Sequence, residues 1–173
     1  MGNNMHFRKM NSADVPAAYE ITLSTRERSF TREAMTAVGI TEESTIEMMD
    51  VTRSHEGWVC EVDGRPVGFA MGNKNTGELW IIAVLPDFER KGIGSRLHNL
   101  TEDWLRSQGW KEAWLAVLQD VQVDGYRFFK NRKWIDDEMR GPFRVMKKSL
   151  GDVPLGPVNP ILWTDRYDAE KPS

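Results

Sequence analysis

The sequence predicts an α+β fold, a mixed α/β domain whose sheet has an antiparallel front half. Two β-rich runs flank Asp63-Gly64, a pair that is typical of a short hairpin. A third apolar run, residues 79–84, follows the turn at residues 75–77, so three strands come one after another as a meander. From residue 93 the apolar positions change to helical spacing. A doubly wound sheet is disfavoured, because such sheets alternate strands and helices along the whole chain.

The first fifty residues predict one strand and three helices. Residues 6–10 form a short first strand, and Ser12 is a suitable N-cap for a helix that continues to about residue 25. Two shorter helices are predicted at about residues 31–39 and 41–49.

The second half of the domain predicts two more helices and three more strands. A helix over residues 92–108 is followed by a strand at 111–118 and a helix at 121–132. Residues 134–137 and 143–148 then predict a final antiparallel pair.

The length of 173 residues fits one domain, residues 1–150, with a tail at residues 151–173. Four prolines in the tail exclude regular secondary structure there. Its apolar residues 161–163 predict that the tail packs along the domain or against a partner subunit.

Composition favours a cytoplasmic protein that binds neither nucleic acid nor a membrane. The net charge of −3 lacks the basic footprint of nucleic-acid-binding proteins. The single cysteine, Cys60, excludes an internal disulfide, and the three histidines lack metal-ligand spacing, so no metal is expected. No apolar run approaches the roughly eighteen residues of a membrane span, and no signal sequence opens the chain.

The turn between the third meander strand and the next helix predicts a phosphate-binding site. Gly92 and Gly94 let the backbone approach a ligand closely, and the helix opens with unpaired N–H groups and the positive end of its dipole. Arg90, Lys91 and Arg96 add positive charge. Neither a Walker A loop nor a dinucleotide fingerprint fits the residues after the second glycine. The alternative is a glycine-rich turn that only starts the helix.

Two blocks of the chain resemble the GNAT N-acetyltransferases. Residues 86–97, Pro-Asp-Phe-x-x-Lys-Gly-Ile-Gly-Ser-x-Leu, are similar to the acetyl-CoA signature of that family, and residues 114–134 are similar to its later strand, helix and strand start. The blocks have the family's order and separation, and the resemblance covers about residues 5–150. It implies a mostly antiparallel sheet of six to seven strands, flanked by about four helices and splayed between its central strands.

The resemblance also implies where acetyl-CoA, the expected co-substrate, would bind. Its pantetheine arm would enter the gap between the strands at 79–84 and 111–118, which Val84 and Ala116 would border. The residues expected to bind the coenzyme are Ile82, Val84, Glu89, Arg90, Lys91, Gly92, Gly94, Ser95, Gln122 and Phe129. Glu89 replaces the usual Gln or Arg and would contribute its backbone. The basic run at residues 130–133 has two interpretations, a solvated helix end or a contact to the 3′-phosphate.

Glu78 is the predicted catalytic base. A primary amine has a pKa near 10, so a group must take its proton before the nitrogen attacks a thioester. Val84 lies six positions after Glu78, roughly 20 Å of strand, which is comparable to the length of a pantetheine arm. The alternative is a surface glutamate at a turn.

The acid that would protonate the departing thiolate has two candidates. Phe129 stands where the family often has a tyrosine, and phenylalanine has no proton to donate. Tyr126, one helical turn earlier, is the predicted acid, with water as the alternative.

These residues predict an acetyl-CoA-dependent N-acetyltransferase in which an amine attacks the thioester directly, since Cys60 lies on an earlier hairpin and is a poor acyl carrier. The backbone near residues 82–84 would polarise the carbonyl.

The alternatives are a non-catalytic acyl-CoA-binding or sensing module and an enzyme for longer acyl groups. The acceptor amine, small molecule or protein, stays open; by resemblance residues 25–30 lie over its site. The expected state is a monomer or homodimer.

Overall fold

The protein, as a computed structural model, is described here for residues 4–25, 31–118 and 124–151. These residues form a seven-stranded sheet in the order β1-β2-β3-β4-β5-β7-β6. Its strands are β1 (Met5–Lys9), β2 (His55–Val62), β3 (Arg65–Asn73), β4 (Glu78–Val84), β5 (Glu112–Leu118), β6 (Ile135–Arg140) and β7 (Phe143–Ser149). Every neighbouring pair is antiparallel except β4 with β5. The predicted α+β fold with a mostly antiparallel sheet is therefore confirmed.

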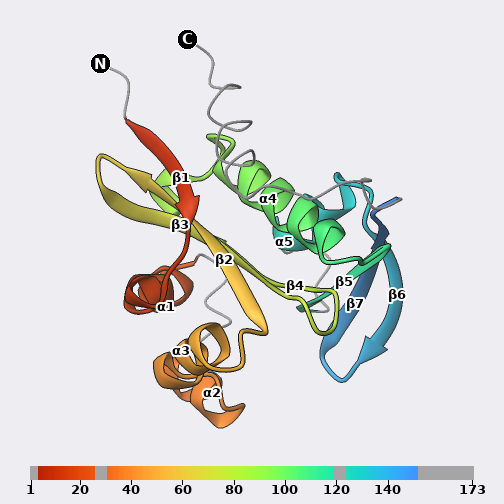
Figure 1. Cartoon of the computed structure of the whole chain (residues 1–173). Coiled ribbons are helices and arrows are strands. Elements are labelled where there is room, and N and C mark those ends of the chain that lie inside the picture. Colours follow the sequence, from red (N-terminus) through yellow and green to blue (C-terminus); the bar gives the residue numbers. More distant parts are fainter. Residues whose placement is uncertain (1–3, 26–30, 119–123, 152–173) are drawn as a thin grey trace.

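The described residues also form five α-helices, each of which the residue pattern predicts, where the resemblance implied about four. They are α1 (Val15–Leu23), α2 (Arg32–Ala37), α3 (Glu42–Asp50), α4 (Ile93–Ser107) and α5 (Asp124–Lys130). Helices α1 to α3 lie on one side of the sheet and α4 on the other (Figure 1). Helix α5 shares the core of α4, because Phe129 of α5 packs in the same apolar cluster as Leu97 and Leu100 of α4. No helix in this part of the chain combines the length and the apolar character needed to cross a membrane.

Helix α4 is the main cover of one face of the sheet. Ile93, Leu97 and Leu100, the residues whose spacing predicts the helix, are buried against the strands. Gly72 of β3 makes room for this contact, because a Cβ atom there would lie 2.8 Å from Cζ3 of Trp104. Gly68 of β3 makes the same kind of room at the start of α4, because a Cβ atom there would lie 3.2 Å from Cγ2 of Ile93 and 3.3 Å from Cγ2 of Val84, at the end of β4.

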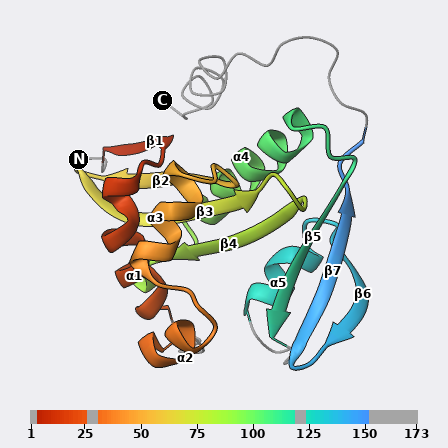
Figure 2. The same cartoon turned by 60° about the horizontal axis from the view of Figure 1, so that its bottom comes forward.

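The central strands β4 and β5 diverge. Glu78 with Trp114 is the single residue pair that joins them within the described ranges. From that pair the two strands run apart, as Figure 2 shows. The splay that the resemblance implied is therefore present, and it leaves one edge of β4 open along most of its length.

The sequence prediction was wrong in some local details. Asn11, not Ser12, caps the first helical turn: its side chain accepts a hydrogen bond from the Ala13 N–H at 2.9 Å, and Asp14 reaches back to the Asn11 N–H. Both residue types are good caps, so the letters alone do not separate them. Strand β6 also extends further than predicted, to Arg140. The predicted packing of the tail falls on residues 152–173, outside the described residues.

Candidate active site

Glu78 begins β4 at the point where the two central strands separate. Its carboxylate has no hydrogen bond or ion pair with any other residue in the described ranges. Burial raises the pKa of this carboxyl to about 7, although Arg140 opposes the shift. A carboxylate with a pKa near 7 takes up and releases protons at neutral pH, which is the property that a general base needs.

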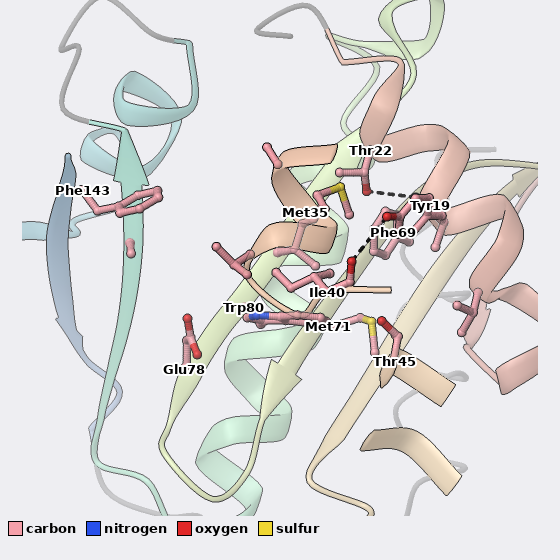
Figure 3. A pocket seen from close by; sticks show the side chains of 16 residues that line it. Tyr19, Thr22, Met35, Ile40, Thr45, Phe69, Met71, Glu78, Trp80 and Phe143 are labelled. Atoms are coloured by element: carbon pink, nitrogen blue, oxygen red, sulfur yellow. Dashed lines mark hydrogen bonds between the residues drawn. The ribbon is translucent and has the colours of Figure 1, made fainter. Parts of the chain in front are cut away.

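A pocket of about 380 Å³ opens beside Glu78. This volume lies in the range of roughly 300–1,000 Å³ that is usual for small-molecule sites. Its walls come from helices α1, α2 and α3 and from strands β3 and β4, while Ala116 of β5 and Phe143 of β7 line its far side. The pocket therefore spans the gap between the central strands. Figure 3 shows the Glu78 carboxylate at the open edge of β4, between that strand and Phe143.

A β-bulge shapes the wall that β4 contributes. In the pairing with β3, Met71 lies opposite Ile81 and Gly72 opposite Leu79, so Trp80 is an extra residue. Neighbouring residues of a regular strand point to opposite faces, but Trp80 and Ile81 both line the pocket. The bulge therefore adds a large indole to the pocket wall, and His55 packs edge-on against that indole, with ring centroids 4.7 Å apart.

The other end of β4 leads into the predicted phosphate-binding turn. Gly92 is the N-cap of α4 in a left-handed conformation, with φ of 82°, and within the described residues no side chain caps this helix start. The N–H groups of the first helical turn therefore need an acceptor from outside the helix. A Cβ atom at Gly92 would meet nothing within 4 Å, so the turn is open to a ligand. Such a turn has the geometry of an anion site.

Charged and strained residues complete this turn. Arg90 has a positive φ of 60°, and Arg90 and Lys91 are exposed. The ammonium of Lys91 lies over the Phe88 ring, 5.3 Å from its centroid. The backbone N–H of Glu89 donates to the carbonyl of Pro86 at 3.3 Å, so at this position the backbone helps to form the turn.

Two residues at the turn were not singled out by the sequence analysis. Phe128 of α5 lies against Gly94, where a Cβ atom would be 3.3 Å from its ring. The guanidinium of Arg132 stacks on the Phe128 ring at 3.5 Å and donates a hydrogen bond to the hydroxyl of Ser95. Arg132 was grouped with the basic run at residues 130–133; its spacing of four from Phe128 is the signal that could have separated it from the lysines.

Ile82 and Val84 lie on the open strand. They pair with Ala70 and Gly68 of β3, so their other strand edge faces the gap. Gln122, also predicted to bind the coenzyme, lies outside the described residues.

The two aromatic residues predicted on α5 are engaged in other contacts. Phe129 is buried among His98, Phe128 and Trp134, in the core. The Tyr126 hydroxyl donates to Asp136 Oδ2 at 2.9 Å, and Asp136 belongs to the outer strand β6. Desolvation and this bond raise the pKa of Tyr126. The hydroxyl is thus turned toward the outer strands, which argues against the predicted role as acid.

Burial raises the pKa of the Cys60 thiol to about 12. A thiol that stays protonated is a poor nucleophile, in line with its expected lack of a role as acyl carrier. In the described ranges, no three His, Cys, Asp or Glu residues gather in a group that could hold a metal ion.

Comparison with known proteins identifies a family and relatives of this chain. The model of the acetyltransferase (GNAT) family matches residues 15–133. An uncharacterised N-acetyltransferase of Methanocaldococcus jannaschii is 29% identical over 109 residues, which cover 56% of this chain and 47% of that protein. The chain thus spans about half the length of this curated relative.

Solved structures share the fold at low sequence identity. The PaiA N-acetyltransferase of Thermoplasma acidophilum, in complex with coenzyme A, has a TM-score of 0.70 and 18% identity, over 84% of this chain and 99% of that one. The ribosomal-protein-S18-alanine N-acetyltransferase of Escherichia coli has a TM-score of 0.67 and 17% identity, over 87% and 97%. With the family match over most of its length, the chain belongs to the acetyltransferase (GNAT) family.

Proposed function

We propose that this protein is an acetyl-CoA-dependent N-acetyltransferase that acetylates a primary amine by direct attack on the thioester. One observation carries the proposal: among the described residues, the open edge of β4 joins a helix start without a side-chain cap at one end to a pocket whose Glu78 carboxylate has no partner at the other. Membership of the GNAT family supports it, as does the shared fold of a relative crystallised with coenzyme A.

The coenzyme would be held mainly by backbone groups. The N–H groups at Gly92, Gly94 and Ser95 suit the pyrophosphate, since they are donors at a helix N-terminus. Arg90 and Lys91 would add positive charge from the exposed side of the turn. The free edge of β4 at Ile82 and Val84 would receive the pantetheine arm as an added half-strand. Gln122, Glu89 and Phe129 are part of the same predicted set.

Glu78 would act as the base. It takes a proton from the ammonium of the acceptor, directly or through water, and the freed nitrogen attacks the carbonyl carbon of the thioester. The new C–N bond forms, the C–S bond breaks, and the coenzyme leaves as a thiolate. For these steps to occur, the acyl group of the bound thioester must reach the pocket side of β4, where Glu78 lies.

Water would protonate the leaving thiolate. The Tyr126 hydroxyl donates to Asp136, and Phe129 has no proton to give. A thiol has a pKa near 8.5, so its thiolate is a tolerable leaving group without an acid. The engaged Tyr126 hydroxyl and the lack of a donor at Phe129 also favour the second candidate function, a domain that binds acyl-CoA without catalysis.

Thiol release from acetyl-CoA separates the two functions. Both predict binding of coenzyme A by calorimetry, but only the enzyme releases thiol when amines are offered. We expect release with at least one primary amine at pH 8 and a large loss in Glu78→Gln. Coenzyme binding without release by any amine would favour the binding domain, and absence of binding would overturn both.

A further inference from the structure

We propose that the acceptor is a primary amine with one positive charge on an apolar body, and that the pocket discriminates against diamines and against amines with a carboxylate. The inference rests on the proposed function, and it names the substrate class for the same site. It comes from the chemistry of the pocket wall, which differs from that of a site for polar or multiply charged amines.

The described wall of the pocket is almost entirely apolar. Twelve of its sixteen residues have apolar side chains, among them Met35, Met71, Trp80 and Phe143. Glu78 is the one acidic residue of this wall, and no lysine, arginine or histidine belongs to it. An amine that enters therefore meets a single charge of opposite sign.

The three hydroxyl groups of the wall already donate to the protein. Thr22 donates to the Ala18 carbonyl at 2.9 Å, Thr45 to the Thr41 carbonyl at 2.8 Å, and Tyr19 to the Ile40 carbonyl at 3.4 Å. Their protons satisfy backbone groups of the helices and loop around the pocket. Their oxygens can still accept a hydrogen bond, but they carry no charge, so among the described lining residues the Glu78 carboxylate is the one group that can form an ion pair with an ammonium.

Charge burial then decides which amines fit. An ammonium next to Glu78 has a partner, but a second ammonium several bonds away would be placed among methionine, tryptophan and phenylalanine side chains. A buried charge without a partner is strongly unfavourable. A carboxylate on the acceptor would meet the same apolar wall and would be repelled by Glu78. An apolar body gains from leaving water.

Matched amines test this directly. Hexylamine and hexane-1,6-diamine differ by one ammonium, and 2-phenylethylamine and phenylalanine differ by one carboxylate. With acetyl-CoA saturating, we expect kcat/KM for the first of each pair to exceed that of the second by about tenfold or more, because of the unpaired buried charge. Equal or better turnover of the diamine or of the amino acid would overturn the inference while leaving the proposed function intact.

A pair of valine variants locates the effect. Val38 lines the pocket and is 72% exposed, whereas Val51 is 71% exposed and lies outside it, after α3. Val38→Glu gives a second ammonium a partner, so the preference for hexylamine over the diamine should shrink by about three- to fivefold. Val51→Glu makes the same change of charge and should leave the preference unchanged. If both variants change the preference equally, the pocket does not determine the preference for hexylamine over the diamine, and the inference is overturned.

If no amine is acetylated, the proposed function fails, and amine binding then tests the inference instead. Calorimetry of the coenzyme-bound protein with hexylamine and with hexane-1,6-diamine compares the affinities of the two ligands directly. Tighter binding of the monoamine would support the inferred ligand class, and equal or tighter binding of the diamine would overturn it.

Discussion

Glu78 and Glu102 are two glutamates on opposite faces of the sheet whose surroundings differ. Glu102 of α4 is buried, but Lys148 Nζ lies 2.6 Å and His98 Nε2 2.9 Å from its Oε1. Burial alone would raise its pKa; the partners hold the pKa below the ordinary value instead. Glu78 has no such partner in the part of the chain that the structure describes, and burial raises its pKa to about 7. A paired carboxylate stabilises the fold, whereas an unpaired one in a pocket can exchange protons.

The largest expected effect is on the rate of Glu78→Gln. The amide keeps the shape of the side chain but cannot take a proton, so kcat at pH 8 should fall by about 100-fold or more. Thiol release with saturating acetyl-CoA and amine measures this. The thermal stability should not fall, because the wild-type protein holds an ionised carboxylate in an unfavourable place at this pH. Turnover within threefold of wild type would contradict the assignment of the base.

Glu102→Gln makes the same chemical change on the other face and should have the opposite outcome. Lys148 loses its charged partner, so the free energy of unfolding should fall by about 2–3 kcal/mol. Urea unfolding at pH 7 checks this. Below the melting range kcat should stay within twofold of wild type. A variant as stable as wild type, or one that folds well yet has lost kcat, would break the comparison.

Two glycines of α4 test the coenzyme end of the site. Gly92 begins the helix with φ of 82°, Gly109 follows its end with φ of 96°, and a Cβ atom at either would meet nothing within 4 Å. Alanine at each should therefore lower stability by a similar amount, about 1 kcal/mol. Gly92→Ala should weaken coenzyme A binding about tenfold, since it disturbs charge-assisted backbone bonds, while Gly109→Ala should leave binding unchanged. Calorimetry that finds equal affinities would remove the turn from the binding site.

Tyr126→Phe should have the smallest effect. The hydroxyl donates to Asp136 and faces the outer strands, so we expect kcat to change by less than about twofold, as for a side chain outside general acid catalysis. Measurements at several pH values check this. A tenfold loss of kcat with unchanged coenzyme affinity would restore Tyr126 as the acid.

Much of the fold could be predicted because it depends on local patterns. Asp63 and Gly64 both have positive φ, as the hairpin signal requires, and the apolar spacing of α4 matches its buried face. The place of Glu78 at the start of β4 also followed from the letters, because a turn precedes an apolar run.

The remaining features depend on pairing between segments that are distant in sequence. The bulge at Trp80 exists only in register with β3, and the stacking of Arg132 on Phe128 beside Ser95 joins α5 to the start of α4. The raised pKa of Glu78 follows from its burial, and burial depends on the packing of several segments rather than on the sequence of β4 alone. These long-range features make up the site, so the sequence indicated the chemistry better than it indicated the residues around it.

The pH dependence of kcat tests the central claim most directly. With acetyl-CoA and a primary amine both saturating, kcat of the wild-type protein should rise between pH 6 and 8 with an apparent pKa near 7, as Glu78 loses its proton. In Glu78→Gln this limb should disappear. A flat wild-type profile over this range, or the same limb in the variant, would contradict a role for Glu78 as the base.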